Sequence, residues 1–196
     1  MRLLKVWLVR HGETDWNREG RWQGHTDVPL NAEGRAQAEA LAERLRGQRL
    51  SAIATSDLSR ARETAQAVAQ VHGLPVLGPY RELRERGYGV FEGLTREQCE
   101  AQYPDLVRSG PPLGLLEPPG SEPRKEVGAR LDRIVRALVT AHGDEHAPVL
   151  LVSHGGAIRT FLSHATEVMV PPVPNTGIYA VDFDGARFVS PRLLPP

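Results

Sequence analysis

Apolar residues in this chain of 196 residues cluster in short runs rich in leucine and valine. Runs of this kind, bounded by charged residues or glycine, predict strands that are buried on both faces of a sheet. The runs are Leu3–Val9, Ala52–Ser56 and Val149–Val152, a weaker one at Pro75–Leu77, and two at the end, Ile178–Phe183 and Arg187–Leu193, that turn at Asp184-Gly185. We therefore expect one sheet built from strands far apart in the sequence.

Between these runs, apolar residues recur at the spacing of a helix with one buried face. The predicted helices are Ala32–Leu45, capped by Asn31, then Leu58–Val71, capped by Ser56 or Asp57, and a longest helix that follows a Ser121 cap with Pro123 in its first turn. Strands and helices alternate, which predicts an α/β fold: a three-layer sandwich whose mainly parallel sheet is flanked by helices. A chain of 196 residues is expected to form a single domain over residues 1–196.

The alternation breaks between Leu94 and Arg124. This segment contains one plausible short helix, where Thr95 and Gln98 have the spacing of a capping box, followed by a stretch rich in proline and glycine. Because regular elements resume after it, we interpret residues 94–124 as a lid-like insertion over the sheet and not as a domain boundary.

Charge and cysteine content narrow the class of partner. The 24 Lys and Arg balance the 24 Asp and Glu, so no overall positive field is available to attract a nucleic acid or an anionic membrane. No apolar run approaches the length needed to cross a bilayer. Cys99 is the only cysteine, which excludes an intramolecular disulfide and a thiolate metal cluster. We expect a cytoplasmic protein whose partner is a small molecule.

Two of the predicted strands end in the same pair of residues, a histidine followed by a glycine. They are His11-Gly12, which Arg10 precedes, and His154-Gly155. Neighbouring parallel strands bring their carboxyl ends to one crevice, so the two imidazoles are expected to meet there. A guanidinium group matches the oxygens of a phosphate, and a neutral imidazole can act as a nucleophile, so these groups indicate phosphoryl transfer. For each histidine, a loop residue that only hydrogen-bonds the backbone remains the alternative.

A further cation is expected at the start of a predicted helix. Arg60 and Arg62 lie in its first turns, where free backbone amides favour an anion. Residues two apart on a helix point in different directions, so only one of these guanidinium groups is expected to face the crevice.

Taken together, these segments resemble the histidine phosphatase superfamily, the group that contains the cofactor-dependent phosphoglycerate mutases and many small phosphatases. The motifs that carry the resemblance are Arg10-His11-Gly12-Glu13 followed by Asn17, Arg60-Ala61 with Thr64-Ala65, Leu83-Arg84-Glu85 through Gly93, and His154-Gly155. They extend from the first strand to the helix after His154. The fold that the resemblance implies, a mainly parallel sheet with the site at the carboxyl ends of its strands, agrees with the fold expected from the pattern.

The resemblance also implies a role for each matching residue. His11 is similar to the phosphorylated nucleophile, Glu85 to the proton donor, and Arg10, Arg60 and His154 to the phosphate pocket, while Asn17, Gln23, Gly24 and Gly155 are expected to bind the substrate around it. Spacing alone does not separate Glu85 from the neighbouring carboxylates, Glu82 and Glu92. Arg62 is assigned to the solvated face of its helix.

Two departures from the mutase pattern bear on the reaction. Gln23 stands where the mutases commonly have threonine, and Arg108 is followed by Ser109 where they typically have two adjacent arginines. Between Leu94 and Ser121 only Arg96 and Arg108 are basic. An insertion of this composition over the site is expected to favour a neutral or apolar leaving group and to admit water.

We therefore expect a phosphomonoester hydrolase that acts through a phosphohistidine intermediate on a small-molecule phosphate. No carboxylates or imidazoles have the spacing of metal ligands, so no metal and no cofactor are expected. His142 and His146 are one helical turn apart, but we interpret them as the fraying end of a helix. Two alternatives remain: a cofactor-dependent phosphoglycerate mutase, and a non-catalytic domain that binds a phosphate or a phosphoprotein.

Overall fold

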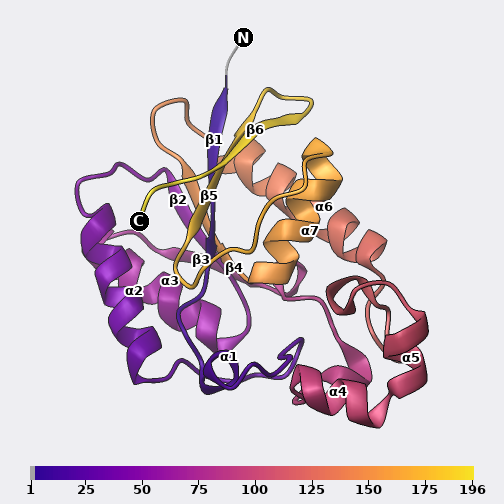
Figure 1. The fold of residues 1–196 in the computed structure, drawn as a ribbon. Helices are drawn as coiled ribbons and strands as arrows, with labels where there is room; N and C mark the ends of the chain where they lie inside the picture. Colours follow the sequence, from indigo (N-terminus) through magenta and orange to yellow (C-terminus); the bar gives the residue numbers. More distant parts are fainter. Residues whose placement is uncertain (1–2) are drawn as a thin grey trace.

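The computed structural model describes residues 3–196, which form a six-stranded sheet in the order β3-β2-β4-β1-β5-β6 (Figure 1). The strands are β1 (Leu4–Arg10), β2 (Ala52–Ser56), β3 (Val76–Tyr80), β4 (Val149–Ser153), β5 (Ile178–Phe183) and β6 (Phe188–Leu193). The strands β1 to β4 are parallel, whereas β5 and β6 add an antiparallel edge. The expected α/β fold with a mainly parallel sheet is confirmed.

Helices cover both faces of the sheet and make three layers, with α2 and α3 on one face and α6 and α7 on the other (Figure 1). The helices are α1 (Asp15–Arg18), α2 (Ala32–Leu45), α3 (Ser59–His72), α4 (Arg96–Gln102), α5 (Pro104–Ser109), α6 (Arg124–His142) and α7 (Gly155–Thr166), with short 3₁₀ turns at Arg81–Leu83, Gly89–Phe91 and Leu113–Leu115. Side chains alternate along β4, so Val149 and Leu151 pack in the cluster under α6 and α7 while Leu150 and Val152 pack under α2 and α3. Burial on both faces explains the uninterrupted apolar sequence of this strand.

The predicted cap of the second helix is wrong. The helix α3 begins at Ser59, and its N-cap residue, Leu58, provides no capping side chain. The backbone N–H and the hydroxyl of Ser59 both donate to Asp27 Oδ1, at 2.8 and 2.7 Å. A distant loop thus supplies the carboxylate that satisfies this helix end. Ser56 and Asp57, the predicted caps, are engaged by side chains of other elements.

The cap predicted for the longest helix is also wrong. The helix α6 begins at Arg124, three residues after Ser121, and its N-cap residue, Pro123, has no side-chain hydrogen bond. The carboxylate of Glu117 accepts the backbone N–H of Arg124 at 3.0 Å in its place. Ser121 instead pairs through its backbone with Tyr88, across the base of the insertion.

The insertion has more regular structure than the sequence indicates. It contains two helices, α4 and α5, where one was expected, because Pro104 occupies the first position of α5, at which a proline needs no backbone N–H. Buried Phe91, Cys99 and Leu116 form a separate apolar cluster within and beside it. Figure 1 shows α4 and α5 beside the sheet layers, beyond the end of α7.

The loop after β1 is held by close contact between two glycines. A Cβ atom at Gly12 would overlap the carbonyl oxygen of Gly34 in the first turn of α2, and a Cβ at Gly34 would overlap the carbonyl oxygen of Glu13. The backbone of α2 can therefore approach the loop that carries His11 only because both positions lack a side chain.

Replacement of Gly34 by alanine is expected to lower the free energy of unfolding by about 1–3 kcal/mol, the usual cost of overpacking. This loss outweighs the gain of up to about 1 kcal/mol from alanine's higher helix propensity. Urea unfolding of Gly34→Ala and of the control Gly47→Ala provides the measurement, since a Cβ at Gly47 would meet no atom within 4 Å. Equal stability of the two variants would contradict the close contact between the loop and α2.

Candidate active site

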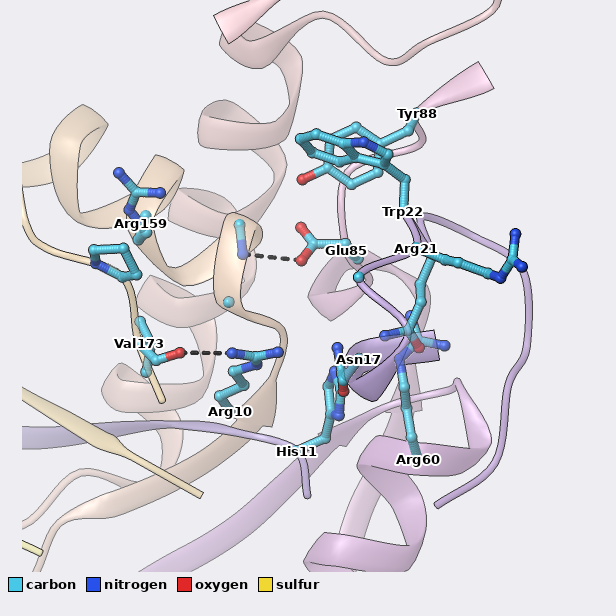
Figure 2. A pocket seen from close by; sticks show the side chains of 15 residues that line it. Arg10, His11, Asn17, Arg21, Trp22, Arg60, Glu85, Tyr88, Arg159 and Val173 are labelled. Carbon is cyan, nitrogen blue, oxygen red and sulfur yellow. Dashed lines mark hydrogen bonds between the residues drawn. The ribbon is translucent and has the colours of Figure 1, made fainter. Parts of the chain in front are cut away.

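A cavity of about 330 Å³ lies at the carboxyl ends of β1 and β4 (Figure 2). Arg10, the last residue of β1, pairs in register with Ser153, the last residue of β4, so the residues that follow the two strands enter the same space. The lining residues are Arg10, His11, Asn17, Gly20, Arg21, Trp22, Gln23, Arg60, Glu85, Tyr88, Gly155, Gly156, Arg159, Pro172 and Val173. The expected meeting of the two strand ends in one crevice is thus observed.

His11 is buried with one ring nitrogen committed to the backbone. Its Nδ1 lies 2.7 Å from the carbonyl oxygen of Gly12. Because a carbonyl can only accept, Nδ1 carries the proton in this contact and the lone pair of the neutral ring is on Nε2. Burial, and then the charges of Arg60 and Arg10, lower the pKa of His11 well below its usual 6.5. The ring is therefore neutral, and Nε2 is available as a nucleophile near neutral pH.

His154 is fully buried, with its ring centroid 5.1 Å from that of His11. Its Nε2 lies 3.0 Å from the hydroxyl oxygen of Ser56, and its Nδ1 has no partner among the described residues. Burial, followed by the charges of Arg60 and His11, lowers the pKa of His154 well below 6.5 as well. The structure therefore brings together two neutral imidazoles, although His154 lies behind the surface that lines the cavity.

Backbone carbonyls hold the two cations beside His11. Arg60 donates from Nη1 to Thr26 O at 2.9 Å and from Nη2 to Gly24 O at 3.0 Å, and Arg10 donates from Nη1 to Val173 O at 2.8 Å. Burial lowers the pKa of Arg60 to about 10, so the group remains charged at neutral pH. The Nε atoms of Arg10 and Arg60 are buried and have no partner in residues 3–196. Two anchored cations with unused donors form a site for an anion.

The second arginine of α3 lies outside the cavity. Arg60 is 0 % exposed and lines the cavity, whereas Arg62 is exposed to solvent. The expectation that one of these two guanidinium groups faces the crevice is therefore met by Arg60.

Glu85 is the carboxylate that the structure places in the cavity. Its Oε1 accepts the backbone N–H of Arg86 at 2.8 Å, and its Oε2 accepts that of Gly156 at 2.9 Å. Of its two neighbours, Glu82 is exposed, and the carboxylate of Glu92 accepts three backbone N–H groups and one hydroxyl in the adjoining loops. Tertiary structure thus separates three carboxylates that spacing could not.

Arg130 of α6 fixes the backbone on which Glu85 lies. Its Nη1 donates to Glu82 O at 2.7 Å and to Arg84 O at 2.8 Å, and its Nη2 donates to Glu85 O at 2.9 Å. Glu122 forms the ion pair that orients this guanidinium group, at 2.6 Å from its Nε. The loop that carries Glu85 is therefore bound to α6 through three backbone carbonyls.

The two glycines after His154 allow this close packing. A Cβ at Gly155 would lie 3.3 Å from Arg10 Cδ, and a Cβ at Gly156 would lie 2.7 Å from Glu85 Oε1 and 2.6 Å from the hydroxyl of Tyr88. Side chains at these positions would displace the arginine and the carboxylate. The first turn of α7 thus presents bare backbone to the site.

The loop residues suggested by the resemblance divide into two groups. Asn17 and Gln23 line the cavity, and Gln23 Oε1 is buried without a partner in the part of the chain that is described. Gly24 does not line the cavity. Its carbonyl oxygen accepts from Arg60 instead, and the carboxylate of Glu92 occupies the space that a side chain on Gly24 would need.

The insertion does not cover the site. None of its described residues lines the cavity, contrary to the expectation that residues 94–124 form a lid over it, and the leaving group expected from the composition of this insertion stays a prediction. The walls come instead from Trp22, Tyr88, Arg159 and Val173, none of which was singled out from the sequence. A signal existed for Arg159, because residues 155, 156 and 159 of a helix that begins after His154 share one face.

No group of three or more His, Cys, Asp and Glu side chains among residues 3–196 could hold a metal ion. None of the helices in this described part is long and apolar enough to cross a membrane.

Fold and site together define the class: an α/β protein with an anion-binding site built around a neutral histidine at the carboxyl ends of parallel strands. The profile of the histidine phosphatase superfamily (branch 1) matches residues 6–193, and the chain belongs to this superfamily. The resemblance stated from the motifs is thus confirmed.

Relatives in this superfamily carry both phosphatase and mutase names. The chain is 36% identical over 194 residues to phosphoglycerate mutase-like protein 4 of Arabidopsis thaliana, covering 94% of this chain and 82% of that protein. It is 36% identical over 161 residues to the uncharacterized phosphatase PhoE of Bacillus subtilis (strain 168), covering 82% and 77%. A mycobacterial glucosyl-3-phosphoglycerate phosphatase solved with VO3 superposes with a TM-score of 0.83 at 31% identity, over 97% of both chains.

Replacement of Arg60 by alanine is expected to weaken the binding of inorganic phosphate about 10- to 100-fold, because charge-assisted hydrogen bonds are lost. Arg62→Ala is the matched control on the same helix, and it should bind phosphate like the wild type. Isothermal titration calorimetry measures both dissociation constants, with circular dichroism to confirm folding. Weakened binding in Arg62→Ala alone would show that the other arginine serves the anion.

Proposed function

We propose that the protein hydrolyses phosphomonoesters of small molecules through a phosphohistidine intermediate at His11. The observation that carries the proposal is the neutral His11 ring, with its Nε2 unprotonated, between the anchored cations Arg10 and Arg60. A nucleophile without a proton and two fixed positive charges are what attack on a phosphate dianion requires.

In the first step, His11 Nε2 attacks phosphorus in line with the leaving oxygen. The N–P bond forms as the P–O bond to the leaving group breaks, and Glu85, protonated at this stage, gives its proton to the leaving oxygen. Arg10 and Arg60 stabilise the charge on the equatorial oxygens. His154 contributes a neutral donor from Nδ1 when its Nε2 accepts the hydroxyl proton of Ser56.

In the second step, water attacks the phosphohistidine from the side that the leaving group has vacated. Glu85 is now a carboxylate, and it accepts a proton from the water as the O–P bond forms and the N–P bond breaks. Inorganic phosphate leaves, and His11 returns to its neutral form with the lone pair on Nε2. One carboxyl thus acts as acid and then as base, and no step requires a metal ion or a cofactor.

Hydrolysis is favoured over a mutase reaction by the surroundings of the cavity. A mutase must exclude water from the phosphohistidine while its substrate reorients. The insertion that could do so contributes no described residue to the cavity wall. The solved relative named a glucosyl-3-phosphoglycerate phosphatase, which matches nearly the full length of both chains, also supports hydrolysis.

Acid-sensitive labelling tests the intermediate. When the enzyme is mixed with ³²P-labelled phosphomonoester in excess EDTA and quenched in alkali, the wild type is expected to retain a phosphoryl label that is lost on acid treatment. His11→Asn should carry no label and should lose turnover, because the attacking nitrogen is absent. Full turnover by this variant, or loss of wild-type turnover in EDTA with recovery on addition of a divalent ion, would contradict the mechanism.

A comparison of two reactions separates phosphatase from mutase. Release of inorganic phosphate from p-nitrophenyl phosphate and from sugar and nucleoside monophosphates is expected to be faster than conversion of 3- to 2-phosphoglycerate in the presence of bisphosphoglycerate. Water should reach the phosphohistidine before a bound phosphoglycerate can turn around. Interconversion that exceeds hydrolysis by a wide margin would identify a mutase instead.

A further inference from the structure

The carboxylate of Glu92 joins two loops beside the cavity, and the mechanism proposed above does not use it. Its Oε1 accepts the backbone N–H groups of His25 and Tyr88, both at 3.0 Å. Its Oε2 accepts the backbone N–H of Thr26 at 3.0 Å and the hydroxyl of the same residue at 2.7 Å. Four donors therefore occupy the four lone-pair sites of the two oxygens.

One of these hydrogen bonds comes from a peptide group that also holds Arg60. The peptide between Gly24 and His25 donates its N–H to Glu92. The carbonyl of the same peptide, Gly24 O, accepts Arg60 Nη2 at 3.0 Å, and Thr26 O accepts Arg60 Nη1 at 2.9 Å. The positive end of the peptide dipole therefore faces a carboxylate and its negative end faces a guanidinium group, an orientation in which each contact strengthens the other.

Arg60 thus has a counter-charge without a direct ion pair to it. Its terminal nitrogens donate to backbone carbonyls, and its buried Nε has no partner in residues 3–196. Burial lowers the pKa of Arg60 to about 10, and Glu92 is one of three carboxylates whose charges oppose this shift. A carboxylate in direct contact would occupy donors that a phosphate needs, whereas Glu92 acts from one peptide away. Figure 2 shows the guanidinium group of Arg60 directed from α3 toward the loop that carries Arg21 and Trp22.

The loop formed by residues 24–26 depends on hydrogen bonds for its position. His25 and Thr26 are exposed to solvent, so burial does not fix this part of the chain. The imidazole of His25 adds one contact, at 3.0 Å from Glu85 O, and the other tie to the loop that carries Glu85 is the carboxylate of Glu92. A Cβ atom at Gly24 would overlap Oε1 of Glu92, so glycine at this position lets the carboxylate reach the loop.

We propose that Glu92 is a positioning residue whose carboxylate fixes the peptide groups of residues 24–26, so that they present Arg60 to the phosphate. The role rests on the proposed function, because it concerns the anion site of the same reaction. Glu92 does not line the cavity and therefore acts on the substrate through Arg60. Its loss is expected to weaken the binding of the phosphate group, whichever leaving group the phosphate carries.

Calorimetric titration with inorganic phosphate tests this role without turnover. Glu92→Gln is expected to weaken phosphate binding about 10-fold, because the amide has no charge and offers one acceptor oxygen where the carboxylate offers two. Glu82→Gln, which removes an exposed carboxylate from the segment that leads to Glu85, is the matched control and should bind phosphate like the wild type. An unchanged dissociation constant in Glu92→Gln would overturn the role.

A double-mutant cycle separates an effect through Arg60 from a general loosening of the cavity. In the Arg60→Ala background, Glu92→Gln should weaken phosphate binding by less than about 2-fold, because the group that Glu92 positions is absent. The same loss in both backgrounds would show that Glu92 does not act through Arg60, and would overturn the inference. Circular dichroism confirms that each variant is folded.

Kinetics separates failure of this inference from failure of the proposed reaction. Glu92→Gln is expected to lower kcat/KM by the same factor for p-nitrophenyl phosphate and for benzyl phosphate, since only the second leaving group needs a proton from Glu85. A loss confined to benzyl phosphate would place the effect on the acid and overturn the inference. Absence of wild-type hydrolysis of both esters, with the binding cycle as expected, would overturn the phosphatase activity alone.

Thr26→Val provides a second variant should Glu92→Gln fail to fold. Valine keeps the branched shape of threonine and removes the hydroxyl that donates to Glu92 Oε2. Phosphate binding is expected to weaken about 2- to 10-fold, and Thr26→Ser, which retains the hydroxyl, should bind phosphate like the wild type. Wild-type affinity in Thr26→Val would count against the inference in the same way as wild-type affinity in Glu92→Gln.

Discussion

Burial of positive charge beside neutral imidazoles is the constraint on which the rest of the site depends. Moving guanidinium groups out of water is costly, and here the cost is offset by backbone carbonyls of Gly24, Thr26 and Val173 instead of carboxylates. A carboxylate partner would cancel the charge that an incoming phosphate needs. The same cations disfavour a further proton nearby, which keeps His11 unprotonated. The buried cations that are costly to remove from water therefore also keep the lone pair of His11 free.

The parts of the structure that follow from local pattern were predictable from the sequence. Apolar runs marked β1 and β4, and the rule that parallel strands share a carboxyl end predicted that the histidines after them lie together. Helical geometry likewise predicted that only one of Arg60 and Arg62 faces the crevice, and the resemblance of the motif selected Arg60. These inferences need only the spacing of apolar residues in a helix or strand and the direction of the strand. Both follow from a few adjacent residues.

The parts that failed depend on contacts between distant segments. Ser56 is a reasonable cap for α3 by its position, but its hydroxyl lies 3.0 Å from a nitrogen of His154, and the cap is supplied by Asp27 from another loop. The insertion has the composition of a mobile lid, yet its apolar residues pack together in a cluster beside the site. The composition of the insertion does not determine where it lies. Its position relative to the sheet depends on the contacts made by its two ends.

Those ends are tied together, which has a consequence for how such proteins diversify. Val90 N–H donates to Pro119 O at 3.1 Å and Glu122 N–H donates to Gly87 O at 2.9 Å, so the chain that leaves the loop carrying Glu85 returns beside that loop. Arg130 then holds the carbonyl of Glu85 from the first helix after the return. The segment between these two hydrogen bonds therefore begins and ends at the same place in the fold. A segment held in this way can be lengthened, shortened or exchanged between its fixed ends without displacing the loop that carries Glu85.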